Sequence, residues 1–107
     1  MKGEIWLANL PQWTGKEQLG KRPVLLMSKN VTNLIVAIPL TSNIKTEKYP
    51  YTLKIKPSDK NCLTKDSIAL IFQIRAIDNK RLIHKIGTLE DSYLKEINQK
   101  LKELLKI

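Results

Sequence analysis

The chain has 107 residues, a hydrophobic content of 42% and a formal net charge of +9, with one cysteine and one histidine. This length supports a single core, and the apolar content is too high for a disordered chain. The lone cysteine excludes an internal disulfide, and neither a signal peptide nor a membrane-spanning stretch is recognisable, so we expect a cytoplasmic protein without membrane contact.

The positive charge is unevenly distributed along the chain. Residues 90–107 carry four lysines and four acidic residues, so the whole excess belongs to residues 1–89. A basic surface attracts polyanions by long-range steering and counterion release, which favours nucleic acid or an acidic protein as partner. A lysine-rich surface can equally serve solubility alone, and composition does not separate the two interpretations.

Five short segments rich in β-branched, aromatic and leucine residues predict strands, because clusters of turn-forming residues separate them. In chain order they are residues 3–8, 22–28, 33–40, 51–56 and 67–74. The fourth alternates cleanly, with Tyr51, Leu53 and Ile55 on one face. The others are apolar on both faces and need cover from a helix or from a second copy of the chain, which favours a homodimer.

The connection between the first two predicted strands, TGKEQLGKR at residues 14–22, carries a carboxylate, an amide and a guanidinium framed by glycines. Glycines let the backbone turn tightly, so Glu17, Gln18 and Arg22 can converge there. Pro23 disfavours helix at Arg22 and fixes the guanidinium at the start of a strand. The same residues also fit a plain surface loop with an ion pair between Glu17 and Arg22.

Two hydroxyls, Thr41 and Ser42, follow Pro39 at the end of the third predicted strand, where they can serve a site or cap the next turn. The one histidine, His84, lies in a basic stretch, which favours a surface position over catalysis. The sequence contains no Walker loop, nucleophile elbow or residue cluster at metal-ligand spacing, so most common enzyme classes and a metal site lose support.

The end of the chain predicts an amphipathic helix over residues 89–106. Thr88 followed by Glu90 and Asp91 is typical of a capping box, and the two carboxylates suit the positive end of the helix dipole. An apolar stripe for packing follows at helical spacing, made of Tyr93, Leu94, Ile97, Leu101, Leu104 and Leu105.

Six sequence segments, in the same order and over nearly the whole length, resemble those of the MazF/PemK family of bacterial toxins. The segments are GEIWLANL from residue 3, TGKEQLGKRPVLLMS from 14, PLTS from 39, KYPYTLKI from 48, KDSIALIFQIRAIDNKRL from 65 and IGTLEDSYLKEI from 86. The resemblance implies one domain over residues 1–107: a mainly β, SH3-like barrel over about residues 1–87, followed by the C-terminal helix.

The resemblance also implies a function. Members of this family are toxins of type II toxin–antitoxin systems that act as homodimeric endoribonucleases. They cleave single-stranded RNA at short sequence motifs without a metal or other cofactor, leaving a 2′,3′-cyclic phosphate and a 5′-OH. Their partner is an antitoxin whose acidic, flexible tail would wrap the basic surface.

The residues of the family's site carry over onto this chain by resemblance. Arg22 would stabilise the transition state, Thr41 would donate a hydrogen bond to the phosphate, and Glu17 would act as the general base. RNA contacts would come from Lys16, Gln18, Ser42, Gln73, Arg75 and Trp13. Trp13 could stack on a base, although packing against the barrel rim fits it as well, while Trp6 suits a core or a dimer interface.

One departure from the family pattern leaves two alternatives open. Relatives commonly carry an acidic residue just before Gln73, where this chain has Phe72. If that acid is needed, the chain would be a catalytically silent RNA-binding relative. The other alternative, a gyrase poison of the related CcdB type, needs an aromatic residue near the C-terminus, and the final LKELLKI has none.

Overall fold

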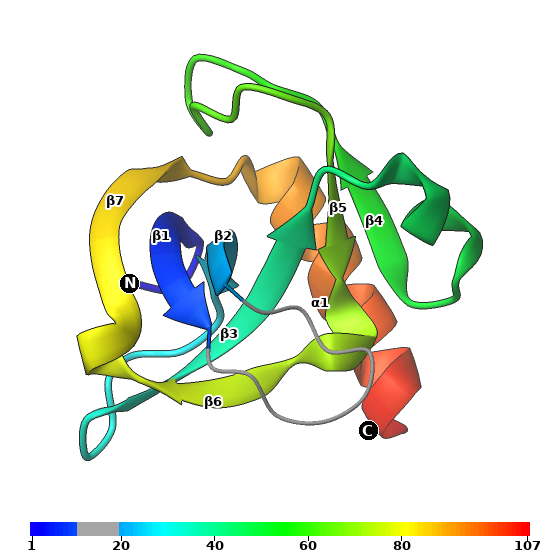
Figure 1. Cartoon of the computed structure of the whole chain (residues 1–107). Helices are drawn as coiled ribbons and strands as arrows, with labels where there is room; N and C mark the ends of the chain where they lie inside the picture. The colour runs from blue at the N-terminus through cyan, green and yellow to red at the C-terminus, as the bar shows by residue number, and fades with distance from the viewer. Residues whose placement is uncertain (11–19) are drawn as a thin grey trace.

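The computed structural model describes residues 1–10 and 20–107, and within them an antiparallel sheet precedes one C-terminal helix (Figure 1). The strands are β1 (Glu4–Leu10), β2 (Gly20–Leu26), β3 (Leu34–Thr41), β4 (Thr52–Ile55), β5 (Ser67–Leu70), β6 (Arg75–Asp78) and β7 (Leu82–Thr88). Short 3₁₀ turns are η1 (Ile44–Lys48), η2 (Ile71–Gln73) and η3 (Asn79–Arg81), and the helix is α1 (Asp91–Leu105).

The sheet is curled like a barrel but does not close. Its strands follow the order β4-β5-β3-β2-β1-β7, and β6 pairs with β3 beside this path. In Figure 1, β7 curves around β1 and β2, while α1 lies behind β3 and β5. The predicted fold, mainly β with a C-terminal helix, is therefore confirmed.

Two buried clusters explain why most of the predicted strands are apolar on both faces. The larger includes Ile5, Leu25, Ile38, Leu40 and Ile97 of α1, and the smaller includes Ala8, Val24, Leu26, Ile35 and Ile77. Successive residues of a strand point to opposite faces, so β2 sends Leu25 to one cluster and its two neighbours to the other. The curled sheet and α1 cover both faces of these strands within one chain.

The last two strands were missed by the sequence analysis, and one predicted strand is too long. The segment 67–74 leaves the extended conformation after Leu70 and forms η2. β6 and β7 give a weak apolar pattern because much of each is exposed: Ile77 is the one buried residue of β6, and Ile83 and His84 of β7 face solvent.

The predicted capping box at Thr88 is wrong. Thr88 is the last residue of β7, and its backbone N–H donates to the Lys60 carbonyl at 3.0 Å instead of belonging to a helix. The helix begins at Asp91, with Glu90 at the N-cap and no side-chain capping bond. The rest of the predicted stripe packs inward, but Leu105 is 51% exposed because it lies at the end of the helix.

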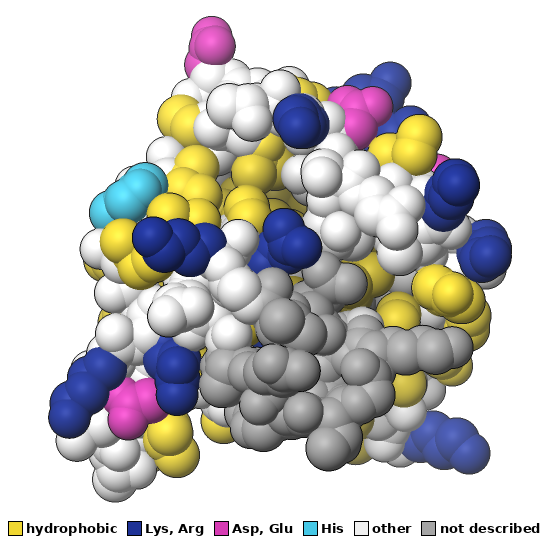
Figure 2. Space-filling model, in the orientation of Figure 1, with side chains coloured by type: hydrophobic (Ala, Val, Ile, Leu, Met, Phe, Trp, Pro, Cys, Tyr) yellow, Lys and Arg dark blue, Asp and Glu magenta, His cyan; other side chains and the backbone are white. Residues whose placement is uncertain are grey.

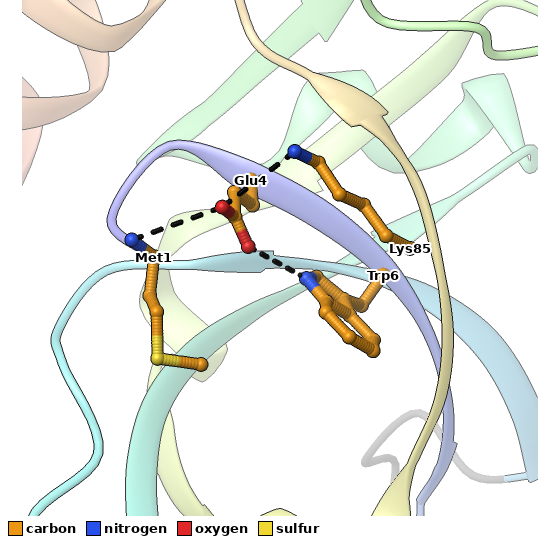
Figure 3. A network of polar contacts seen from close by, with 4 residues as sticks. All are labelled: Met1, Glu4, Trp6 and Lys85. Carbon is orange, nitrogen blue, oxygen red and sulfur yellow. Dashed lines mark hydrogen bonds and ion pairs between the residues drawn. The ribbon is translucent and has the colours of Figure 1, made fainter.

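A polar network ties the start of β1 to β7 (Figure 3). The Glu4 carboxylate accepts a hydrogen bond from Trp6 Nε1 at 2.9 Å and pairs with Lys85 Nζ at 3.6 Å and the Met1 amino group at 3.9 Å. The Trp6 hydrogen bond, aided by the two positive charges and opposed by partial burial, lowers the pKa of Glu4. Trp6 itself is half-buried against the smaller cluster.

We predict that Trp6→Phe weakens the fold in a pH-dependent way. The variant keeps a ring in the cluster but loses the donor to ionised Glu4, which should cost about 1 kcal/mol of unfolding free energy near neutral pH. Because the folded-state pKa of Glu4 is depressed, this contribution is present above the unfolded-state pKa and is lost as the pH falls through the folded-state value.

Urea unfolding at about pH 7 and about pH 3 measures this change, because ordinary glutamate titrates between them. The difference in unfolding free energy between the wild type and Trp6→Phe should be smaller at the lower pH. Lys85→Gln is the control and should have a smaller effect, because its ion pair is exposed. A Trp6→Phe difference that does not vary with pH would contradict the assigned role of this hydrogen bond.

Candidate active site

Antiparallel pairing of β2 with β3 brings Arg22 and Thr41 together. The register joins Val24 to Pro39, Leu25 to Ile38 and Leu26 to Ala37. Continued by two residues, the same register sets Arg22 opposite Thr41. Arg22 is exposed, whereas Thr41, the last residue of β3, is nearly buried. Two of the predicted catalytic residues are therefore neighbours across the sheet.

A pocket of about 190 Å³ opens at this edge of the sheet. Its apolar lining comes from Pro23, Leu40 and Leu63, its hydroxyls come from Thr41, Ser42, Thr64 and Ser67, and its cations are Arg22 and Lys65. Within the described part of the chain, no acidic side chain lines it. Two cations beside several hydroxyl donors make a site that suits an anionic group such as a phosphate.

The Thr41 hydroxyl caps the following turn and still has a proton to donate. Its oxygen accepts a hydrogen bond from the Asn43 backbone N–H at 3.2 Å, which is the turn cap that the sequence allowed. A hydroxyl can also donate one hydrogen bond, and no group in residues 1–10 or 20–107 accepts one from Thr41. Ser42 is exposed next to it on the pocket rim. The capping and ligand-binding roles are therefore compatible.

The opposite wall of the pocket comes from the segment before β5, which the sequence analysis missed. β3 and β5 pair through Thr41 and Ile68, and this pairing carries Lys65 to the pocket. Asp66 is held elsewhere, since its carboxylate pairs with Lys54 Nζ at 3.6 Å. In the sequence, Lys65 is one lysine among many before a strand, and nothing local distinguishes it.

The segment that carries this wall is anchored by Asn61, whose side chain is fully buried. Its Oδ1 accepts from the backbone N–H groups of Ser58 and Leu63, each at 3.0 Å. Its Nδ2 donates to the Lys56 carbonyl at 2.9 Å and to Glu90 Oε1 at 3.1 Å. These four bonds use the full capacity of a carboxamide, so the segment is tied to the start of α1.

Glu90 takes part in this anchor as a carboxylate. Burial acts to raise the pKa of Glu90, but hydrogen bonds from Ser58, from its own backbone and from Asn61 outweigh burial, and the pKa is lowered. The ionised Glu90 carboxylate is therefore the form that accepts the hydrogen bond from the Asn61 amide.

A glycine in β7 allows the anchored segment to approach. A Cβ added at Gly87 would lie 2.8 Å from the Lys60 carbonyl oxygen and closer still to the backbone of Asn61. Real Cβ atoms do not come this close to backbone, so any larger residue would push the segment away.

The other predicted RNA contacts lie elsewhere or outside the described residues. Gln73 lines a second, larger pocket of about 470 Å³ together with Phe72, and Arg75 lies half-buried on β6 in register with Ala37. Neither of them lines the Arg22 pocket. The predicted residues Trp13, Lys16, Glu17 and Gln18 lie outside the described residues.

The distribution of charged side chains and of possible metal ligands limits what the described surface can bind. On the face of the molecule drawn in Figure 2, Lys and Arg side chains are spread widely, with few acidic side chains between them. In the described ranges, no group of three or more His, Cys, Asp or Glu residues could hold a metal ion. Over the same ranges, the structure contains no helix that is both long and apolar enough to span a bilayer.

Comparisons with known proteins identify the family of the chain. Residues 1–105 match the family model described as PemK-like, MazF-like toxin of type II toxin–antitoxin system. A curated relative, Endoribonuclease MazF of Staphylococcus saprophyticus subsp. saprophyticus, is 36% identical over 101 residues, covering 91% of this chain and 83% of that protein.

Solved structures of MazF resemble the fold closely. MazF (Form-I) from Deinococcus radiodurans superimposes with a TM-score of 0.82 at 29% identity, covering 98% of this chain and 94% of that one. The MazE–MazF structure (Form-II) from the same organism gives a TM-score of 0.72 at 29% identity, with coverages of 99% and 94%.

We predict that Asn61→Ala destabilises the protein by about 3 kcal/mol or more, because it leaves several buried polar groups without partners. Urea unfolding measures the loss. Asn98→Ala on α1 is the matched control and should change the unfolding free energy by about 0.5 kcal/mol or less, since Asn98 makes no hydrogen bond through its side chain within the described residues. Equal effects of the two substitutions would rule out the anchor.

Proposed function

Because the chain belongs to the family of PemK-like, MazF-like toxins of type II toxin–antitoxin systems and is an endoribonuclease, we propose that it cleaves single-stranded RNA in the Arg22 pocket. The observation that carries this assignment is the meeting of Arg22, Thr41 and Lys65 in a pocket that no described carboxylate lines. Cleavage occurs at short sequence motifs, because one pocket surrounds the scissile bond while neighbouring side chains contact the flanking bases.

Arg22 binds the scissile phosphate. Attack of the ribose 2′-OH on the adjacent phosphorus builds negative charge on the phosphoryl oxygens, and a planar guanidinium can grip two of them at once. Lys65 adds a second positive charge from the opposite wall. Since these two cations neutralise the growing charge, the proposed reaction takes no metal ion or other cofactor.

The proton transfers complete the reaction. A base removes the 2′-OH proton as the oxygen attacks, the P–O5′ bond breaks, and the departing 5′ oxygen receives a proton. Thr41 donates its hydrogen to a phosphoryl oxygen and helps to hold the phosphate in line with the attacking oxygen. Glu17, assisted by Gln18, remains our candidate for the base. The products are a 2′,3′-cyclic phosphate and a 5′-OH.

Phe72, which replaces the acidic residue common in relatives, does not line the Arg22 pocket. It lies in η2 and lines the second pocket, where its ring meets that of Tyr49 edge to face at 6.1 Å. An aromatic residue at this position therefore leaves the lining of the Arg22 pocket unchanged. This location favours the nuclease over the silent RNA-binding alternative.

The partner of this toxin is an antitoxin, as in the MazE–MazF structure. We propose that an acidic, flexible segment of the antitoxin covers the Arg22 pocket. A pocket with two cations and no described carboxylate attracts acidic side chains by the same electrostatics that attract phosphate. Antitoxin and RNA would then exclude each other.

The protein acts as a homodimer through the surface around the second pocket. This pocket is lined mainly by apolar and aromatic side chains, and Tyr49 and Phe72 on it are 46% and 40% exposed. Exposed aromatic side chains of this kind are enriched in protein interfaces. A second copy that covers them would remove the largest exposed aromatic cluster of the described surface from water.

The function is tested by incubating the protein with a long unstructured RNA, with and without EDTA, and mapping the cut sites and their end chemistry. Cleavage that leaves cyclic phosphate ends and is insensitive to EDTA is expected. Arg22→Ala should lower the cleavage rate by about 100-fold or more, the scale of losing one transition-state donor. Arg22→Lys should recover little of this, because an ammonium cannot grip two oxygens in one plane.

Two further variants separate the role of the Thr41 hydroxyl from its shape. Thr41→Val removes the donor and should slow cleavage, whereas Thr41→Ser keeps it and should stay close to the wild-type rate. Unchanged unfolding free energies would show that each variant is folded. Wild-type rates for both Arg22→Ala and Thr41→Val would refute the proposed site.

The dimer is tested by Phe72→Lys, which places a charge in the proposed interface. Sedimentation equilibrium should show a dimer for the wild type and a weaker dimer, by about tenfold or more, for the variant. Lys56→Glu, an exposed change of charge away from this pocket, is the control and should leave the dimer intact. A variant that dimerises like the wild type would place the interface elsewhere.

A further inference from the structure

A separate pocket of about 320 Å³ lies at the corner where β6 turns into β7. It is lined by Asn9 at the end of β1, Asp78, Lys80, Arg81 and Ile83. None of these residues lines the Arg22 pocket, and none entered the proposed reaction.

The charges of this corner pocket are available to a ligand. The one carboxylate in its lining, Asp78, accepts the backbone N–H of Lys80 at 2.9 Å as the cap of η3. Lys80 and Arg81 form no ion pair with any described residue. The pocket therefore presents two cations against one carboxylate that is already engaged, which favours an anion.

The remaining lining suits a nucleobase. Ile83 is 46% exposed, so it offers an apolar surface to a flat ring, and the Asn9 carboxamide can donate to and accept from the polar edge of a base. A nucleotide joins an anionic phosphate to such a base. The corner pocket thus carries both kinds of contact within a volume of ligand size.

The sheet places this pocket two strands away from Arg22. Ala8 of β1 pairs with Arg22 of β2 on one side and with Leu82 of β7 on the other. Arg22 and Leu82 are therefore separated by two strand spacings, roughly 10 Å. Arg81 and Ile83 flank Leu82 along the chain, so the corner pocket lies at a similar separation from the Arg22 pocket.

We propose that the corner pocket binds one nucleotide of the RNA strand that flanks the scissile phosphate. Lys80 and Arg81 hold its phosphate, and Ile83 and Asn9 contact its base. This assignment rests on the proposed function, because it takes the strand cut at Arg22 as the ligand. It adds a binding site for the substrate strand beyond the residues that act on the cleaved bond.

Binding is measured with RNAs that carry a 2′-deoxyribose at the cut site, so that attack is impossible and affinity is read without cleavage. Fluorescence anisotropy compares a short RNA confined to the nucleotides around the cut with RNAs extended on the 5′ or the 3′ side. The double variant Lys80→Ala/Arg81→Ala is compared with Lys95→Ala/Lys102→Ala, which removes the same charge from the exposed face of α1.

The corner variant should bind one of the two extended RNAs about tenfold more weakly, the scale of a lost charge-assisted contact. Its salt dependence on that RNA should fall by about one to two charges. Its affinity for the short RNA should equal that of the wild type. The α1 variant should match the wild type on all three RNAs.

Three results would overturn the inference, and they differ from a failure of the proposed function. Wild-type affinity of the corner variant for both extended RNAs would exclude the site, as would an equal loss on the short RNA. Unchanged RNA binding with weakened binding to polyglutamate would assign the corner to an acidic protein instead. If the wild type neither cleaves nor binds RNA, the proposed function fails, and this inference fails with it.

Discussion

The buried carboxamide of Asn61 makes the contacts on which the arrangement of the candidate active site depends. It saturates its four hydrogen bonds with the backbone around it and with Glu90, so the segment between β4 and β5 has one position relative to α1. Gly87 leaves room for that position. Lys65 stands at the end of this anchored segment, so its placement in the pocket is a consequence of packing outside the pocket itself.

The register of β2 and β3 positions the residues on the other side of the pocket. Arg22 and Thr41 face each other because the pairing of β2 with β3 continues past its last buried pair. Slipping this pairing by one residue would turn Val24 and Leu25 out of the clusters that they fill, so core packing holds the proposed catalytic pair in place. Stability and chemistry thus depend on the same register.

β1 connects the functional surfaces. Its first residues are tied to β7 by the Glu4 network, and its later residues lie between Arg22 on one side and the corner pocket on the other. An RNA strand that crosses β1 would meet cations at both ends of its path. A rigid strand between the two proposed binding sites fixes their spacing, which would suit recognition of an extended single strand.

The sequence by itself determined the fold class and the helix, and it singled out Arg22, Thr41 and Ser42 as candidates, because strong apolar patterns and ordered motifs are local properties of the chain. It missed β6 and β7, whose exposed residues blur the pattern, and it placed the helix cap at Thr88, whose backbone the tertiary fold assigns to a strand. Lys65, the anchoring role of Asn61 and the corner pocket were decided only by the tertiary structure. Each arises from contacts between segments far apart in sequence, and no local pattern encodes which segments will meet.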